Sequence, residues 1–316
     1  MSDQTPDPVP REYSPPDSAS MRSWQNTVDA LRLLLAQRRL YSRSKRWLSL
    51  RIIGMLVITL VAPVVSVLWT EIAVVAGAVA GLWIFVGRTV LIQLEKRTSA
   101  QAAAVQEMFD IQLFGMPSLG HRTPSPSLEE ISTIAGDDQD IIAAATNQEL
   151  LDWYEIEPFK NSLVTVAICQ RANASYSDRL LRSHANVWIS LVAVWATLLI
   201  IAAIWYELSL SVFVLGIVLP LLPAFLDAVE YWYGIRRAAA DRRDLVVGIE
   251  SKLEKGAHEL DGQDVLVWQS RLYNLRRDVP QVPDFLYRLQ RKKNEAAMRS
   301  AANQLSLRAE RDSEDG

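Results

Sequence analysis

Residues 52–69 read IIGMLVITLVAPVVSVLW and residues 72–87 read IAVVAGAVAGLWIFVG, with only two residues between them. A second pair of apolar runs covers residues 187–206 and 210–226 and is separated by three residues. None of the four runs contains Asp, Glu, Lys, Arg or His. A membrane-spanning helix needs about 20 apolar residues, and about 17 suffice where the bilayer thins. Because lipid admits only helices or closed barrels, and the runs do not alternate with period two, the sequence predicts an all-α membrane protein. We expect four transmembrane helices in two hairpins, with a helical cytoplasmic region.

Basic residues flank all four spans on one side, whereas neither hairpin turn contains Lys or Arg. The flanking residues are Arg43, Lys45, Arg46, Arg51, Arg88, Lys96, Arg97, Arg179, Arg182, Arg236, Arg237, Arg242 and Arg243. Short loops rich in Lys and Arg stay in the cytoplasm. The sequence therefore predicts that the N-terminus, the central segment and the C-terminus are all cytoplasmic.

The remaining composition excludes several functional classes. The net charge is −3, and the basic residues cluster where topology explains them, which argues against direct DNA binding. Cys169 is the only cysteine, so no intrachain disulfide forms. The three histidines lie far apart, and the sequence has no P-loop, dinucleotide turn, nucleophile elbow or HExxH motif. We expect neither an enzyme nor a protein with a metal or cofactor.

The composition divides the chain into six segments. A proline-rich disordered tail is expected at 1–20, an N-terminal cytoplasmic helix at 21–51 and the first hairpin at 52–87. A central cytoplasmic helical region is expected at 88–186, the second hairpin at 187–226 and C-terminal cytoplasmic helices at 227–316.

The cytoplasmic helices can be placed approximately. The second span is expected to continue past Arg88 as a polar helix, and Ser127 and Glu130 have the spacing of a capping box. Further helices are expected around residues 139–156, 161–183, 228–255, 265–278 and 284–310.

Three features of the spans are candidates for function. Ala73, Gly77 and Gly81 are small residues spaced by four, a pattern that lets membrane helices approach closely, either between protomers or within one hairpin. Pro220 and Pro223 interrupt the last span, where they form either the hinge of a gate or a static bend.

The third feature is a set of carboxylates beside the spans. Glu71 and Glu207 are in the outer turns, and Asp227 and Glu230 follow the last span. Rings of carboxylates at pore mouths favour cations, although acidic residues beside water are often simply solvated.

Two cytoplasmic segments, QEMFDIQLFG at 106–115 and CQRANASYSDRLLR at 169–182, mix polar and aromatic residues. The chain resembles the SMODS-associated four-transmembrane effectors of bacteria in these segments and in the order of helices and hairpins around them. The matching positions are Gln106, Glu107, Phe109, Asp110, Cys169, Gln170, Arg171, Asn173, Asp178 and Arg182. The chain departs from the family at residues 117–119, where Pro-Ser-Leu replaces an expected tryptophan.

The resemblance implies a role in anti-phage defence. Such effectors accompany a nucleotidyltransferase that makes a cyclic-oligonucleotide signal, and they are expected to assemble as homo-oligomers, open pores in the bacterial inner membrane and thereby arrest the infected cell. A non-conducting membrane scaffold that recruits a cytoplasmic partner is the alternative.

An anionic nucleotide requires cationic groups and an aromatic surface. The best candidates for such a site are Trp153, Tyr154, Lys160, Arg171, Arg179 and Arg182. Alternatively, Arg179 and Arg182 only anchor the third span at the lipid headgroups.

Overall fold

The computed structural model describes residues 13–68, 73–117, 122, 124–157, 161–278 and 281–282. Within the helices, the side chains of residues 59, 62–68, 73, 76, 220 and 223 are not described. Over these ranges the regular secondary structure is entirely helical, as the sequence predicts.

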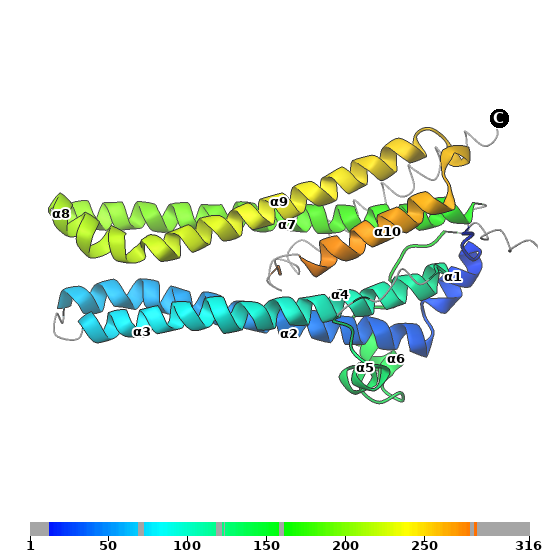
Figure 1. Cartoon of the computed structure of the whole chain (residues 1–316), viewed down its shortest axis with the longest axis horizontal. Coiled ribbons are helices and arrows are strands. Elements are labelled where there is room, and N and C mark those ends of the chain that lie inside the picture. The colour runs from blue at the N-terminus through cyan, green and yellow to red at the C-terminus, as the bar shows by residue number, and fades with distance from the viewer. Residues whose placement is uncertain are drawn as a thin grey trace, which may run out of the picture.

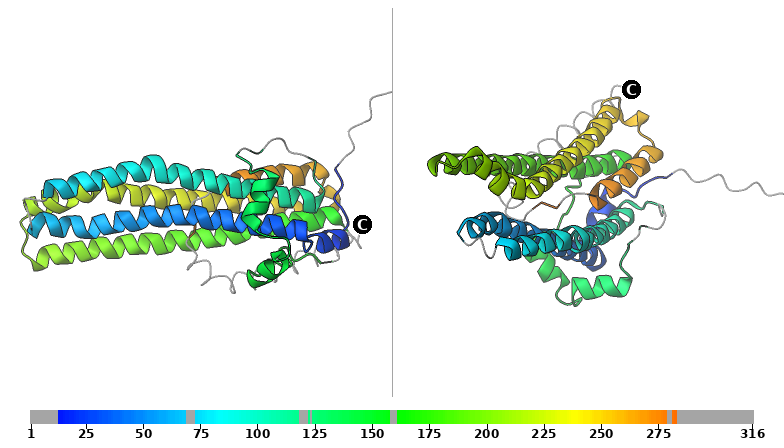
Figure 2. Two further views of the ribbon diagram at one scale, coloured as in Figure 1. Left: turned by 90° about the horizontal axis from the view of Figure 1, so that it is seen from below. Right: turned by 60° about the vertical axis from the view of Figure 1, so that its left-hand side comes forward.

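Two long antiparallel helical hairpins form the body of the molecule. The first consists of α2 (Val28–Leu68) and a helix that runs through α3 (Ala73–Val86), a π-helical turn (Gly87–Leu91) and α4 (Ile92–Phe114). In Figure 1 the apolar ends of both hairpins lie at the same end of the molecule, and Figure 2 shows the long helices side by side.

The second hairpin has the same construction. It consists of α7 (Ser162–Trp205) and a helix that runs through α8 (Leu210–Phe213), a π-helical turn (Val214–Val218) and α9 (Leu219–Leu253). Both hairpins thus carry their apolar runs at one end and continue as polar helices at the other, without a break between the two parts.

The shorter elements gather at the end opposite the hairpin turns (Figure 1). They are α1 (Ser18–Trp24), α5 (Leu128–Ala135), α6 (Ile141–Asn147), a 3-10 turn (Ala257–Glu259) and α10 (Gly262–Arg277). Helices α5 and α6 pack on α2, whereas α10 contacts α4, α7 and α9. Helix α10 therefore touches both hairpins.

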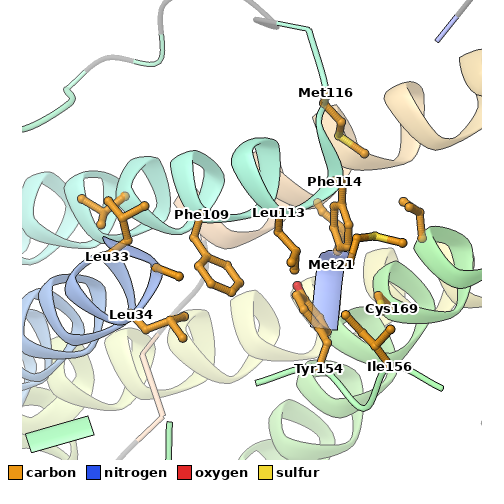
Figure 3. Close-up of a cluster of buried hydrophobic side chains, with 14 of the residues drawn as sticks. Met21, Leu33, Leu34, Phe109, Leu113, Phe114, Met116, Tyr154, Ile156 and Cys169 are labelled. Atoms are coloured by element: carbon orange, nitrogen blue, oxygen red, sulfur yellow. The ribbon is translucent and has the colours of Figure 1, made fainter. Parts of the chain in front are cut away.

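The polar end of the molecule has a conventional hydrophobic core. Phe109, Leu113 and Phe114 of α4 point toward Met21 of α1 and Tyr154, and all five are buried (Figure 3). Phe109, Leu113 and Phe114 form one apolar face of α4 because their positions recur at helical spacing. Helix α4 then ends at a glycine, Gly115, whose φ of 62° suits a residue without a Cβ.

The apolar end is largely exposed. The continuous helices Gly77–Phe114 and Ser162–Trp205 are long and apolar enough to cross a membrane, by length and composition, and hardly any of their apolar stretch is buried inside the molecule. Leu191, Val194 and Leu198 of α7, for example, are each more than half exposed. Such a surface fits lipid rather than water.

Two sequence expectations are wrong in detail. The tail expected to be disordered to residue 20 is ordered from Tyr13, because the Tyr13 hydroxyl donates to the Phe114 carbonyl (2.7 Å) and Asp17 caps α1. The helix expected at 139–156 covers only Ile141–Asn147, because Glu149 and Asp152 adopt left-handed backbone conformations that end it. By contrast, the capping box of Ser127 and Glu130 is confirmed at the start of α5.

The C-terminal helices are described in part. Helices α9 and α10 correspond to the helices expected at 228–255 and 265–278. The helix expected at 284–310 lies outside the described residues.

Candidate functional site

Seven polar side chains meet where α4, α7 and α10 come together, and we call them the buried polar cluster. They are Glu107 and Asp110 of α4, Tyr154 of the loop before α7, Gln170 and Asn173 of α7, and Gln269 and Arg276 of α10. The spacing of three or seven within each helix places its two members on one face.

Asp110 is the centre of the cluster and is fully buried. Its Oδ1 accepts a hydrogen bond from the Tyr154 hydroxyl (2.9 Å). Its Oδ2 accepts from Gln269 Nε2 (3.0 Å) and from Arg276 Nη1 (2.5 Å). One carboxylate thus holds α10 and the loop before α7 against α4.

The two glutamines extend the cluster to the second hairpin. Gln269 Nε2 also donates to Glu107 Oε2 (2.7 Å), and Gln269 Oε1 accepts from Gln170 Nε2 (3.1 Å). The Gln170 amide donates in addition to the Val265 carbonyl (2.9 Å). The amide of Gln269 therefore bridges α4 and α7.

Asn173 makes longer contacts on the other side of the cluster. Its Oδ1 accepts from Arg276 Nε (3.4 Å), and its Nδ2 donates to the Tyr154 hydroxyl (3.4 Å). Two buried atoms, Arg276 Nη2 and Gln170 Oε1, have no hydrogen-bond partner among the described residues. The cluster is thus dense but not saturated.

Charge inside the cluster is nearly balanced. Arg276 lies between Asp110 and Glu107, and Arg122 reaches Glu107 from outside (3.3 Å). Burial raises the pKa of the Glu107 carboxyl to about 7, although Arg276 counteracts this effect. Burial opposes the charge of Arg276, but Asp110 and the other neighbours outweigh it and raise the pKa of the guanidinium above its usual value.

The arrangement is suited to holding helices together rather than to catalysis. Its acids, base and amides are bonded to one another and are covered by the hydrophobic core. Among the described residues, no three His, Cys, Asp or Glu side chains are placed to hold a metal ion. Removing one member would leave a buried polar group unpaired, which is costly.

The family-like motif residues lie in several different surroundings. Glu107, Asp110, Gln170 and Asn173 belong to the buried polar cluster, whereas Phe109 and Cys169 lie in the hydrophobic core. Gln106 is buried beside them and accepts from the Tyr41 hydroxyl (3.4 Å). The remaining motif residues, Arg171, Asp178 and Arg182, form ion pairs elsewhere on α7.

The residues expected to bind a nucleotide are not gathered into one open surface. Arg171 is paired with Glu250 of α9 (2.6 Å), and Arg182 is paired with the buried carboxylate of Asp178. Arg179 is half-buried on the same helix. The arginines of α7 are thus mostly engaged with carboxylates.

The aromatic candidates are also engaged. Trp153 packs against the hydrophobic core, and the Tyr154 ring is buried with its hydroxyl in the polar cluster. Lys160 lies outside the described residues.

A shallow open cleft beside α5 is lined by Ser132, Thr133, Gly136, Asp137, Asp138 and Gln139. Its two carboxylates would repel an anionic ligand, so it does not suit a nucleotide.

The small residues of α3 face open space. A Cβ built on Gly77 or Gly81 would meet no atom within 4 Å, and the side chain of Ala73 is not described. The close approach within the hairpin occurs elsewhere: a Cβ on Gly54 of α2 would lie 2.1 Å from the Trp83 ring. Sequence reasoning missed this contact.

The two prolines of the last span lie directly after an irregular turn. Pro220 and Pro223 are in the first turns of α9, and the π-helical turn Val214–Val218 precedes them. Pro220 has no N–H to donate to the Gly216 carbonyl, which explains the wider turn at this place.

The four carboxylates expected at pore mouths differ in their surroundings. Asp227 forms an ion pair with Arg88, at the start of the helix that becomes α4. Glu207, with a φ of 49°, and Glu230 are exposed. Glu71 lies outside the described residues.

Sequence reasoning also missed the α10 half of the polar cluster. Four residues of α10 recur at helical spacing and are all buried: Val265, Gln269, Leu272 and Arg276. The buried face of α10 is therefore half apolar and half polar. A polar residue inside an apolar stripe is the signal that would have identified them.

Comparison with known proteins agrees with this architecture. A family model described as the SMODS-associating 4TM effector domain matches residues 19–305. A probable CBASS effector molecule of Bacillus cereus (strain VD146) is 22% identical over 292 residues, which cover 87% of this chain and 94% of that protein. No solved structure matches the chain significantly. Since the match extends over nearly all of the described helices, the chain belongs to the SMODS-associating 4TM effector domain family.

Proposed function

We propose that the protein is a signal-gated membrane effector of bacterial anti-phage defence that assembles as a homo-oligomer and permeabilises the inner membrane. The observation that carries the proposal is the continuity of the long helices. Each hairpin has an exposed apolar end suited to lipid, and the same helices form the walls of the buried polar cluster at the other end. A change in the cytoplasmic part therefore reaches the membrane through rigid elements.

We propose the topology predicted by the basic residues, with four spans and both termini in the cytoplasm. It is supported by the common orientation of the two hairpins, because α3 and α8 lie at one end of the molecule, far from α1 and α10 (Figure 1). The soluble mass then faces the compartment in which a nucleotidyltransferase would make its signal.

The proposed signal is a cyclic oligonucleotide, as the family and the name of the Bacillus cereus relative suggest. An anionic ligand that binds Arg171 and Arg182 has to compete with Glu250 and Asp178. When a phosphate replaces the Glu250 carboxylate at Arg171, the contact of α7 with α9 changes. The ligand then binds the arrangements with and without this contact with different affinities. Only such a difference in affinity allows a ligand to shift a conformational equilibrium.

The buried polar cluster would couple this exchange to the hairpins. Because α10 contacts both hairpins, a shift of Gln269 or Arg276 changes the relation between α4 and α7. The unpaired atoms of Arg276 and Gln170 leave the present arrangement short of its full hydrogen bonding, so a shift of α10 would give them new partners.

The charge-free spans are consistent with a pore that stays dry until it widens. The alternative, a scaffold that recruits a cytoplasmic partner and conducts nothing, shares the same helices and the same coupling.

Ion flux separates the two functions. The full chain in liposomes that contain a fluorescent ion indicator should show no flux alone and a large flux when a cyclic oligonucleotide is added. The Arg171→Gln variant, which removes one proposed ligand contact, should need more ligand for the same flux. Absence of flux from well-inserted protein over a panel of cyclic di- and trinucleotides that bind to it would refute the pore and leave the scaffold.

A further inference from the structure

Two carboxylates at the polar end of the apolar spans are paired with arginines. Asp227 of α9 is paired with Arg88, and Glu95 of α4, which is buried, is paired with Arg51 of α2 (3.0 Å). Glu230 is exposed, and its charge also acts on Arg88. Acidic charge at this level of the molecule is therefore largely compensated.

Four basic side chains lie further along the same two helices, and we call them the basic collar. They are Lys96 and Arg97 of α4 and Arg236 and Arg237 of α9. All four are exposed, and none forms an ion pair with a described carboxylate. Three of them have no carboxylate partner among the described residues, and Lys96 interacts with Glu95 only through the charge of its neighbour, which Arg51 already pairs.

The ion pair of Arg88 with Asp227 places the two halves of the collar at one depth. Lys96 and Arg97 follow Arg88 by eight and nine positions, and Arg236 and Arg237 follow Asp227 by nine and ten. At 1.5 Å per residue, both pairs lie about 12–15 Å beyond the ion pair along their helices.

The direction of the helices turns these side chains toward the membrane. Both helices run from the apolar end to the polar end, and side chains on a helix lean toward its N-terminus. The long stems of Lys and Arg can extend along the helix while the charged groups approach the headgroups.

Aromatic side chains precede the arginines on α9. Trp232 and Tyr233 lie one turn closer to the span than Arg236 and Arg237, with ring centroids 5.8 Å apart. The Arg236 guanidinium carbon is 5.7 Å from the centroid of the Trp232 ring, and Tyr233 is 68% exposed. Aromatic rings followed by basic groups are typical of the inner interface of a bilayer.

We propose that the basic collar binds the headgroups of anionic phospholipids in the inner leaflet. The proposal rests on the membrane insertion proposed above, but not on conduction. Each basic residue near an anionic surface contributes an affinity factor of about five, so the pair on α9 contributes about 25-fold.

The test uses the full chain, purified in neutral detergent, and titrates it with phosphatidylglycerol or phosphatidylcholine while bound lipid is counted by native mass spectrometry. The wild type should bind phosphatidylglycerol in preference to phosphatidylcholine. Arg236→Gln/Arg237→Gln should weaken phosphatidylglycerol binding about 25-fold and leave phosphatidylcholine unaffected. The matched control, Arg22→Gln/Lys255→Gln, removes two exposed basic side chains from the opposite end of the molecule and should bind like the wild type.

Three results would overturn the proposal: equal binding of the two lipids by the wild type, equal loss in the control variant, or unchanged binding in the collar variant. Soluble glycerol 3-phosphate should not compete at the concentrations that saturate phosphatidylglycerol binding, and full competition would assign the collar to free phosphates instead. The test measures lipid binding and not ion flux. If the protein conducts ions but fails this test, only the proposal that the basic collar binds lipid is refuted, and the proposed function stands.

Discussion

Arg276 Nη1 lies 2.5 Å from Asp110 Oδ2, and this ion pair joins α10 to α4 where both side chains are buried. Among the described residues, the pair is the shortest charge contact of the cluster that connects the hairpins. Its geometry makes it the first point at which the coupling can be tested.

Replacing Arg276 with Met should destabilise the protein by about 3–5 kcal/mol, because Asp110 remains as an uncompensated buried charge. The double variant Asp110→Leu/Arg276→Met should lose less than the sum of its single variants. Thermal unfolding of the purified chain measures both effects. Arg277→Met is the matched control: Arg277 pairs with Asp278 at the surface, so its loss should cost less than about 1 kcal/mol. Equal losses at the two positions would contradict the buried role of Arg276.

Glu107 should make stability fall as the pH rises from about 4.5 to about 7. Its folded-state pKa is raised by burial to about 7, so the folded protein holds a proton that the unfolded chain has already released. The contribution of Glu107 to the free energy of unfolding is therefore fully present below the pKa of the unfolded chain. It decreases by up to about 3 kcal/mol as the pH rises to about 7. Glu107→Gln should flatten this part of the curve of unfolding free energy against pH. A variant curve that stays parallel to the wild type would show that another group is responsible.

Gly77→Leu/Gly81→Leu should leave the single chain as stable as the wild type, because the space beside both glycines is open. If α3 forms the contact between protomers, the same change should reduce the yield of crosslinked oligomers in membranes. Gly54→Ala provides the contrast, since its Cβ would overlap the Trp83 ring and should lower stability within the hairpin. Unchanged crosslinking in the double leucine variant would exclude this face from assembly.

Pro220→Ala/Pro223→Ala should restore the N–H that can bond to the Gly216 carbonyl and thereby remove the π-helical turn at Val214–Val218. We expect the variant to insert normally but to show a changed ligand dependence of ion flux in liposomes. Flux identical to that of the wild type would identify the turn as a static feature.

Reporter domains fused after Arg97, Arg182 and Arg243 should all be found in the cytoplasm, because every basic cluster is predicted on that side. Paired phosphatase and fluorescent fusions measure this directly. A periplasmic location for any one fusion would refute the two-hairpin topology.

The helices could be predicted from the sequence because their signals are local. The apolar runs and the capping box at Ser127 each depend on a few neighbouring residues. The end of α6 could not be predicted, because Glu149 adopts a left-handed conformation that is uncommon for its residue type, and Asp152, a type that adopts it more often, does so only in some contexts.

The polar cluster could be predicted only by half. Glu107, Asp110, Gln170 and Asn173 stood out through their motif, but the sequence alone did not reveal that they meet. Their partners on α10 come from about 160 residues beyond α4, and such pairing depends on tertiary packing rather than on periodicity. For the same reason, the ion pair between Arg171 and Glu250 was not foreseen. The pair of Asp178 and Arg182 is a local i,i+4 contact on α7, which the sequence alone could have indicated.

The unbroken passage of α7 from the polar cluster to the hairpin turn has a mechanical consequence. A helix of 44 residues is about 66 Å long, so it acts as a lever whose short arm lies beside Gln170 and whose long arm ends at Trp205. Trp205 is about 52 Å from Gln170 along the helix, so a tilt of only about 5° about Gln170 would carry the far end through about 5 Å. In the proposed pore, rearrangement of a few hydrogen bonds at one end of α7 would therefore displace the membrane end of the helix by several times the length of a bond.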